Sequence, residues 1–253
     1  MFTARTILDV ARGSDARVGI GFVGEDQGVR RITSATRRIG LEKPIIFNDP
    51  WRLVEALSIG DIDAAVRGNL DANSTMSAIK TIFSLKRILR AALMQPKKGS
   101  IILLAPVGVD EGWAVEDKIE FINLGSKFLT NFNIEPRIGV LSGGRKGDKG
   151  RHPIVDKTLE DAEFVVRHFA GSGLDVKDCE ILIENAIADR NLILAPDGIS
   201  GNLIFRALHF LGGWRAIGAP VLNLEKVFID TSRAKKSYID SIALASAIAS
   251  MRK

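Results

Sequence analysis

The sequence predicts an α/β protein whose mostly parallel sheet is covered by helices on both faces. Short apolar runs typical of buried strands, such as Ile101 to Leu104 and Leu192 to Ala195, alternate along the chain with segments of helical periodicity. This alternation indicates parallel strands that are connected by helices. With 46% hydrophobic residues in a chain of 253 residues, the core is large enough for one large domain or two smaller ones.

The first elements are apolar runs that end at turn residues. Arg17 to Gly24 is predicted as the first strand, after a short helix over 3–12. Pro44 to Phe47 is predicted as a second strand because Asn48-Asp49-Pro50 is turn chemistry. The other elements predicted before residue 100 are helices over 25–39, 51–57 and 76–83, a strand over 62–66, and a solvated helical face that carries Lys80, Lys86, Arg87, Arg90, Lys97 and Lys98.

The rest of the chain continues the alternation from the strand at Ile101 to Leu104. Its last element, from Lys236 to Met251, has apolar residues at helical spacing and is predicted as a core helix or a dimer face. Between these two, we predict helices over 123–132, 155–169, 184–189 and 200–208, and strands over 137–141, 192–195, 219–224 and 226–230.

Composition excludes several classes of protein. The net charge of +5 favours anionic partners, but the cations are scattered among acids without a recognition motif, so we expect no nucleic-acid binding. A single cysteine, Cys179, allows no internal disulfide and favours the cytoplasm. No apolar run has the length of a signal peptide or membrane span. The three histidines show no ligand spacing, so we expect no metal site.

A glycine-rich basic loop follows the strand at 137–141. Glycines let backbone amides converge on a ligand, and Arg and Lys supply counter-charge, so the loop is a candidate phosphate site. The alternative is a mobile surface loop. The residues predicted to bind are Ser142, Gly143, Gly144, Arg145 and Lys146, within a loop that continues to His152.

The stretch from Leu192 to Leu208 predicts a strand, a tight polar loop and a helix. In an open α/β sheet, ligands sit beyond the carboxyl ends of strands, where helix N-termini offer free N–H groups. We therefore predict an anion or polar-ligand site here, although helix-cap and turn roles explain the same residues equally well. The residues are Asp197, Ser200, Gly201 and Asn202.

Gly19, Gly21 and Gly24 satisfy G-x-G-x-x-G in letters. The fingerprint requires its glycines after the strand, whereas here Ile20 and Phe22 belong to the apolar run itself. A dinucleotide-dependent oxidoreductase is therefore a third-ranked hypothesis. We identify no S-adenosylmethionine loop either, and the cofactor stays unknown.

The order of the loops resembles that of the phosphotransacetylase superfamily over nearly the whole chain. The motifs that carry the resemblance are Gly24-Glu25-Asp26, Arg67-Gly68, the run from Glu135 to Ser142 with the basic loop and Val155-Asp156-Lys157, Ser200-Gly201-Asn202, Ile217 to Pro220, and Thr231-Ser232-Arg233. Within this superfamily, the stretches from Asp197 to Asn202 and from Phe228 to Lys235 are similar to the archaeal methanogenesis marker protein 4 group, also called methyltransferase subunit X.

The resemblance implies a fold like that of isocitrate dehydrogenase and phosphotransacetylase, with two α/β/α subdomains around a cleft. The first subdomain combines 1–87 with 218–253 and the second is 88–217. It also implies a homodimer, a small anionic ligand in the cleft and a link to methanogenesis. Methyltransferase partner subunits follow from the group's name.

The resemblance further implies catalytic roles for three residues. Ser232 and Arg233 match a serine-arginine pair that positions a thiol and holds phosphate, and Asp240 is nearest to a carboxylate that acts as a base toward coenzyme A. Asp240 is displaced by one residue, which rotates a helical side chain by about 100°. Met76 stands where acyltransferases have an arginine, and Arg67 is the nearest cation that could substitute. These departures support the alternative of a non-catalytic binding or assembly protein.

Overall fold

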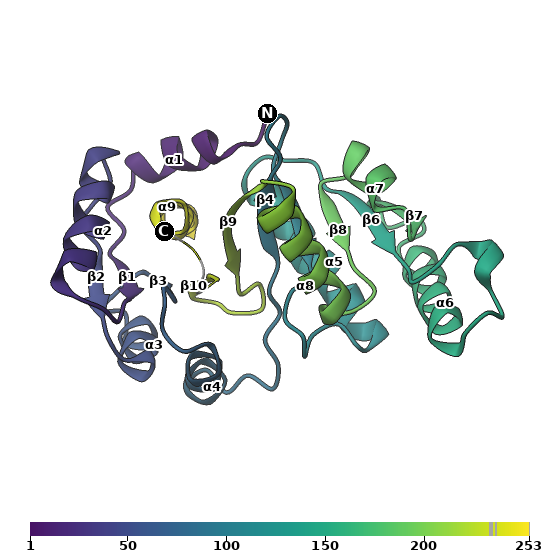
Figure 1. Cartoon of the computed structure of the whole chain (residues 1–253), viewed down its shortest axis with the longest axis horizontal. Coiled ribbons are helices and arrows are strands. Elements are labelled where there is room, and N and C mark those ends of the chain that lie inside the picture. The colour runs from purple at the N-terminus through teal and green to yellow at the C-terminus, as the bar shows by residue number, and fades with distance from the viewer. Residues whose placement is uncertain (233–234, 236, 253) are drawn as a thin grey trace. The chain divides into compact units, whose positions relative to one another are not determined.

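The structure is a computed structural model that describes residues 1–232, 235 and 237–252 (Figure 1). The chain divides into two compact units. The terminal unit comprises Phe2–Ile88 and Ile217–Lys253, and the central unit comprises Leu89–Ala216 with Met1. The boundaries expected from the sequence fell at 87/88 and 217/218. Each unit is an α/β layer structure, so the predicted fold class is confirmed.

The terminal unit is built on strands in the order β2-β1-β3-β10-β9. The first four strands are parallel, and β9 runs antiparallel to β10. Parallel pairing places the carboxyl ends of β1, β3 and β10 at one edge of this sheet. The elements are α1 (Ala4–Arg12), β1 (Val18–Gly21), α2 (Asp26–Arg38), β2 (Ile45–Phe47), α3 (Pro50–Ile59), β3 (Ala64–Val66), α4 (Ala72–Ile82), β9 (Arg215–Pro220), β10 (Val227–Asp230) and α9 (Ile239–Arg252).

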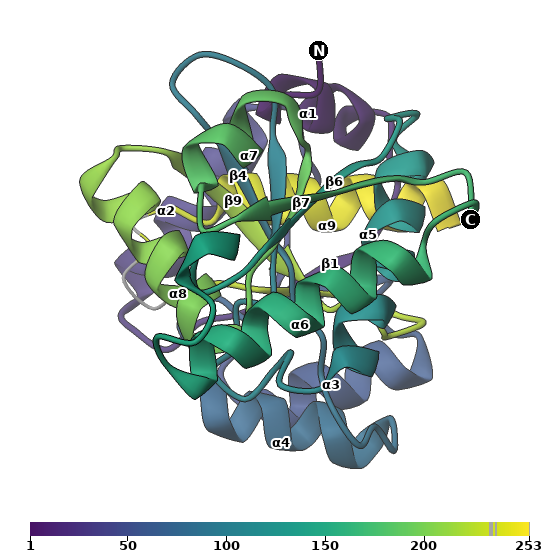
Figure 2. The same ribbon diagram turned by 90° about the vertical axis from the view of Figure 1, so that its right-hand side faces the viewer.

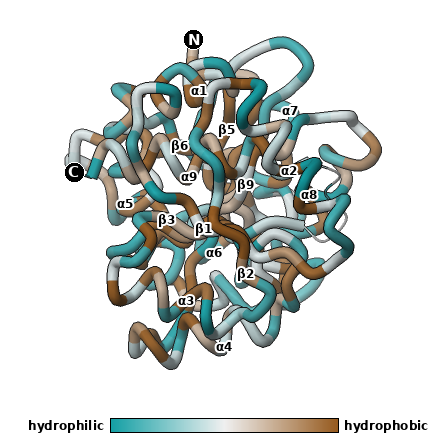
Figure 3. The backbone as a smooth tube through the Cα atoms, turned by 90° about the vertical axis from the view of Figure 1, so that its left-hand side faces the viewer, coloured by the Kyte–Doolittle hydropathy of each residue, from teal (hydrophilic) through white to brown (hydrophobic). Residues whose placement is uncertain are grey.

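Helices cover both faces of this sheet. One face packs against α3, which also contacts α4, and the other packs against α9, which contacts α1 and α2. The helix α9 is buried continuously from Ser241 to Ala249, so it is a core helix of this unit. In Figure 3, β1 and β2 are among the segments coloured as hydrophobic.

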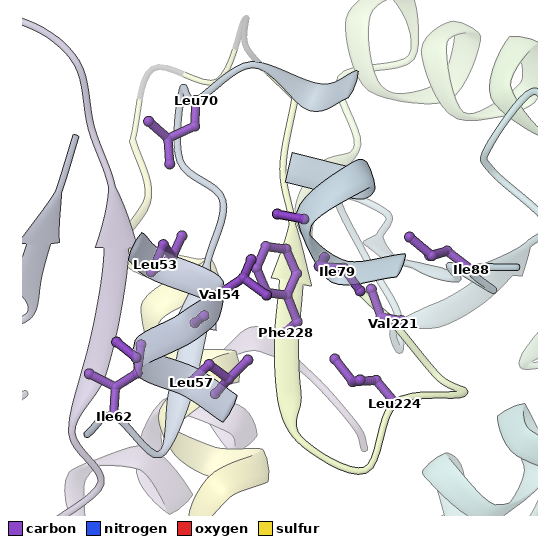
Figure 4. Packing of buried hydrophobic residues seen from close by; sticks show 13 residues of the cluster. Leu53, Val54, Leu57, Ile62, Leu70, Ile79, Ile88, Val221, Leu224 and Phe228 are labelled. Atoms are coloured by element: carbon purple, nitrogen blue, oxygen red, sulfur yellow. The ribbon is translucent and has the colours of Figure 1, made fainter. Parts of the chain in front are cut away.

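The core on the α3 and α4 side is centred on Phe228 of β10. Its ring is 1% exposed and lies among aliphatic side chains from α3 and α4, as Figure 4 shows. Burying aromatic and aliphatic side chains is the main stabilising contribution to such a unit. Met76 of α4 is partly buried and packs against the same cluster, so this side chain serves the core.

The central unit has strands in the order β4-β5-β8-β6-β7. All adjacent pairs are parallel except β4 with β5. The helices α5 and α6 lie on one side of these strands and α7 and α8 on the other (Figure 2). The elements are β4 (Ala92–Gln95), β5 (Ile102–Ala105), α5 (Val115–Asn131), β6 (Arg137–Leu141), the 3-10 turn η1 (Lys146–Asp148), α6 (Pro153–His168), β7 (Asp175–Glu180), α7 (Ile183–Asp189), β8 (Leu192–Leu194), α8 (Gly198–Arg206) and the π-helical turn η2 (Ala207–Leu211).

Two strands differ from the sequence-based expectation. The basic stretch predicted as a solvated helical face contains β4, because Leu93 and Met94 are fully buried between its cations. β7 was not predicted because it contains several charged residues. It lies at the edge of the sheet, where most of its side chains are half-buried or exposed and need not be apolar. Both segments are strands because they pair with neighbouring strands of the sheet, and the local sequence does not show that pairing.

Candidate functional site

The loops predicted to bind ligand in the central unit begin at one edge of its sheet. β5, β8 and β6 are parallel neighbours, so the segments after Ala105, Leu194 and Leu141 leave the sheet at the same edge. This is the edge at which open α/β sheets bind ligands.

The turn after β8 is held by Asp197. Its side chain caps α8, accepting hydrogen bonds from the Ser200 amide (2.8 Å) and from Ser200 Oγ (3.0 Å). The Gly201 amide donates to the Asp197 carbonyl at 3.0 Å. An Asp at this position satisfies amides that a helix end otherwise leaves open. The donors of Ser200 and Gly201 are therefore engaged within the turn itself.

The same turn approaches the loop after β5 very closely. A Cβ atom on Gly198 would lie 1.6 Å from the Gly108 carbonyl oxygen, and one on Gly201 would lie 1.9 Å from the Pro106 oxygen. Asn202 Nδ2 donates to the Val107 carbonyl at 2.8 Å. These three contacts explain both glycines and the asparagine of the motif by packing, because only glycine leaves room for a backbone oxygen.

A buried ion pair anchors the loop after β5. Arg90 Nε donates to Glu111 Oε1 at 2.6 Å, and the amides of Arg90 and Gly108 donate to Glu111 Oε2. Burial raises the pKa of Glu111, and the Arg90 charge opposes that rise. The carboxylate thus fixes the loop that receives Gly198 and Asn202.

The glycine-rich loop after β6 is ordered by its own acceptors. The Gly143 amide donates to Thr158 Oγ1 and the Arg145 amide donates to Asp148 Oδ2, each at 2.8 Å. Ser142 is buried, and its hydroxyl donates to the Gly144 carbonyl at 2.9 Å. The loop therefore has a defined conformation, with the turn η1 at its tip.

Several donors of this loop remain available to a ligand. In the part of the chain that the structure describes, the Arg145 guanidinium has no hydrogen bond or ion pair, and the exposed amides of Lys146 and Gly147 have no acceptor. Lys146 is 77% exposed and lies 3.7 Å from Asp178. A guanidinium, an ammonium and two open amides in three consecutive residues form a donor set suited to a phosphate or carboxylate.

We expect the loop's order to depend on an ionised Asp148. The Arg145 amide and then the Arg151 side chain hold the pKa of this carboxyl below its ordinary value. A lowered folded-state pKa adds stability above the ordinary pKa, and that stability is lost as the pH falls through the lowered value. The variant Arg151→Gln should move the Asp148 pKa back toward its ordinary value in an NMR titration. Lys146→Gln is the control, and an unchanged pKa in Arg151→Gln would contradict the assignment.

Arg67 lies at the carboxyl edge of the terminal unit and is buried. Its Nε donates to the carboxylate of Asp230, its Nη1 to the Leu70 carbonyl at 2.7 Å, and its Nη2 to the Thr231 carbonyl. Every nitrogen of the guanidinium is thus engaged inside the chain. The side chain joins the end of β3 to the end of β10 and holds the loop on which Ser232 lies.

The loop after β10 is fixed at its base by Thr231. Thr231 Oγ1 donates to the Gly68 carbonyl at 2.7 Å, and Gly68 itself has a φ of +64°. Ser232 follows and is half-buried, whereas Arg233 lies outside the described residues. Asp240 is half-buried in the first turn of α9. The sequence-based roles of Ser232, Arg233 and Asp240 stay predictions.

Packing also accounts for the glycines of the first strand. Cβ atoms on Gly19 and Gly21 would lie 2.5 Å from Ile62 and 2.2 Å from Leu70, so both positions are close contacts inside the sheet layer. Among the described residues, no group of three or more His, Cys, Asp or Glu side chains is placed to hold a metal ion. Over the same residues, none of the helices combines the length and apolarity required to cross a bilayer.

Comparison with known proteins identifies the family. A protein from Methanosarcina barkeri, named "Putative methyltransferase mtx subunit X", is 46% identical over 218 residues, which are 85% of this chain and 80% of that protein. A protein of the same name from Methanosarcina acetivorans is 45% identical over 85% of this chain and 78% of its own length. This chain belongs to the mtx subunit X family. No family model matches it.

The mtx subunit X fold is that of phosphotransacetylases. A phosphotransacetylase from Streptococcus pyogenes superimposes with a TM-score of 0.73 over 99% of both chains, at 18% sequence identity. At this identity the likeness concerns the fold, because unrelated functions share folds. The expected resemblance to the phosphotransacetylase superfamily is confirmed at this level.

Proposed function

We propose that this protein is a transferase subunit that binds an anionic, phosphate-bearing ligand, with its ligand anchored on the loop after β6. The observation that carries the proposal is the set of open donors at Arg145, Lys146 and Gly147, at the ligand-binding edge of an α/β sheet. The phosphotransacetylase fold and the family name support group transfer, and the Methanosarcina relatives support a link to methanogenesis. A second copy of the chain and methyltransferase subunits are its proposed macromolecular partners.

Each loop has a distinct role in this proposal. Arg145 and Lys146 hold the anion, while Gly143, Gly144 and Ser142 keep the loop in its bound shape. Asp197, Ser200, Gly201 and Asn202 support the edge by fixing the loop after β5 against α8. Arg67 positions the loop that carries Ser232 and Arg233, and Asp240 is the proposed base.

Arg145→Ala should weaken anion binding. A charge-assisted hydrogen bond contributes about 1.5–3 kcal/mol, so we expect the Kd to rise about tenfold or more. Isothermal titration with inorganic phosphate, acetyl phosphate and coenzyme A measures it. Arg167→Ala, which removes an exposed arginine of α6, is the matched control and should change nothing. If none of the three probes binds the wild type, or if Arg145→Ala binds as tightly, the proposed site is wrong.

A second candidate function is ligand binding or assembly without catalysis. Met76 favours it, because the position at which acyltransferases carry an arginine is here occupied by a side chain that packs on the core. An uncharged thioether offers no donor to phosphate. Assays of acyl transfer between acetyl phosphate and coenzyme A, and of methyl transfer, separate the two functions. Turnover that disappears in Asp240→Asn supports the transferase, whereas binding without turnover of any donor supports the second function.

A further inference from the structure

The outer face of α2 concentrates positive charge. From Arg30 to its end at Arg38 the helix contains four arginines and no acidic residue, and all four arginines are exposed. Arg30 and Arg37 are seven residues apart, as are Arg31 and Arg38, so they form two adjacent columns with about 10.5 Å between the two rows. Thr36 is buried and marks the opposite, inner side. Figure 1 shows α2 at the outer side of the terminal unit. We call the four arginines the arginine face.

The four guanidinium groups are not neutralised from within the described chain. Over residues 1–232, 235 and 237–252, none of them forms a hydrogen bond or an ion pair, although Asp26 precedes Arg30 by the four residues of a helical ion pair. The surface cations of α6 differ, because Lys157 and Arg167 are each paired with an acid four residues away. A helix face that is merely solvated usually alternates its charges as α6 does. Solvation therefore does not explain the composition of α2.

The stability of the helix does not explain the arginines either. Cations in the last turn, as at Arg37 and Arg38, interact favourably with the helix dipole. Arg30 and Arg31 lie in the amino-terminal half of the helix, where the dipole does not favour a cation and only the mutual repulsion of the charges remains. The arginine face therefore lowers the stability of α2 unless an anionic partner covers it.

A small residue, Ser34, lies at the centre of the arginine face. It is exposed, and it is separated by three or four residues from each arginine, so all four are its neighbours on the helix surface. A short side chain at this point leaves space for an acidic side chain of a partner to reach both rows of guanidinium groups. A guanidinium pairs with a carboxylate through two parallel hydrogen bonds, which a lysine ammonium cannot do.

We propose that the arginine face binds a helix of a partner protein whose acidic side chains repeat every seven residues. Two helices that pack at a shallow angle present matching side chains at this repeat, and facing rows of opposite charge select which helices pair. The inference rests on the proposed function only in taking the partner to be another subunit.

The composition of the face favours a protein over the two other anionic partners. A membrane surface requires large apolar side chains beside the cations, whereas the residue among these arginines is Ser34. Four charges along about 12 Å of helix are also fewer than the roughly 6–10 phosphate contacts of a DNA-binding surface. An acidic helix needs no more than the two rows that α2 presents.

The probe is a synthetic alanine-rich helical peptide with glutamates in two adjacent columns at the seven-residue repeat. It is titrated into the full-length protein at low ionic strength, where exposed charges are screened least, and NMR chemical shifts report binding. Because each exposed ion pair contributes little, we expect a Kd of about 1 mM or tighter. A peptide of the same composition with its glutamates distributed around the helix should bind about tenfold more weakly, because it presents no charged rows.

Charge reversal on α2 should remove the binding without harm to the fold. Arg30→Glu with Arg31→Glu should raise the Kd of the peptide at least about tenfold. Urea unfolding should stay unchanged, because acids are tolerated toward the amino end of a helix. Lys127→Glu with Arg167→Glu makes the same change in net charge on exposed side chains of α5 and α6, and this matched control should bind the peptide as the wild type does.

Ser34→Glu tests the geometry of the face from within the chain. Its carboxylate lies three or four residues from every arginine, so it should pair with them, stabilise α2 and raise the Kd of the peptide at least about tenfold. Ser34→Gln has nearly the same shape without the charge and should bind the peptide as the wild type does. Unchanged peptide binding in Ser34→Glu contradicts the proposed arrangement.

Three further results overturn the proposal. One is a wild type that does not bind the glutamate peptide, and another is equal binding by the wild type and Arg30→Glu with Arg31→Glu. The third is tighter binding of duplex DNA or of phosphatidylserine vesicles that the same double variant abolishes. Phosphate titrated in parallel keeps the ligand site separate: a protein that binds the peptide but no phosphate contradicts only the ligand site, and one that binds phosphate but no peptide contradicts only the arginine face.

Discussion

Arg67→Ala should destabilise the terminal unit by about 3–5 kcal/mol, because it removes the buried arginine that is ion-paired with the carboxylate of Asp230. Asp230 is 9% exposed, and the Leu70 and Thr231 carbonyls lose their donors in the same step. The free energy of unfolding in urea at neutral pH measures the change. Arg145→Ala removes an exposed arginine side chain for which no ion pair is seen among the described residues, and should cost less than about 0.5 kcal/mol.

A double variant separates the ion pair from the rest of the site. In Arg67→Met with Asp230→Asn no unpaired charge remains, so its cost should be smaller than the sum of the two single costs. If Arg67→Ala unfolds at the same urea concentration as Arg145→Ala, the guanidinium is not a structural centre. Its predicted role as a phosphate ligand would then be the better explanation of its position.

The alternation of strands and helices was readable from the sequence because burial on both sheet faces imposes apolar runs on β5, β8 and β6. The strand β4 could not be identified from the sequence, because it has only four residues and is flanked by lysines and arginines that hide its apolar pattern. Likewise, the helix after β8 was expected to open at Ser200 to Asn202, whereas the Asp197 cap begins α8 at Gly198. The capping residue marks this start more closely than the small polar residues that follow it.

The loops of the site could be predicted from their turn and capping residues, but the long-range contacts that hold these loops could not. The cap residue Asp197 and the basic loop at Arg145 are visible as local patterns. The partnership of Arg67 with Asp230 joins residues 163 positions apart, and Glu111 carries no motif that marks it as an anchor. The local signal for such a pair is a charged residue at the end of an apolar run, as Asp230 is after Val227 to Ile229.

Gly198→Ala tests the close contact between the α8 turn and the loop after β5. Two opposing effects decide whether the substitution raises or lowers the free energy of unfolding. At the first position of a helix, alanine is favoured over glycine by up to about 1 kcal/mol through backbone entropy. Here, however, the new Cβ would lie 1.6 Å from the Gly108 oxygen and 2.9 Å from the Glu111 oxygen, so backbone must move. Overpacking costs about 1–3 kcal/mol where side chains can yield, and rigid backbone should place this variant at more than about 3 kcal/mol.

Gly147→Ala is the matched control, because its Cβ would meet nothing within 4 Å. Asp197→Ala should lower the free energy of unfolding by about 1 kcal/mol, between the effects of Gly147→Ala and Gly198→Ala, because it removes only the helix cap. Urea unfolding ranks the three variants by their free energy of unfolding. In Gly198→Ala, amide hydrogen exchange over 106–112 should be faster, because the new Cβ displaces this loop. If Gly198→Ala is instead as stable as the wild type, the two loops do not touch as described, and packing does not explain this glycine.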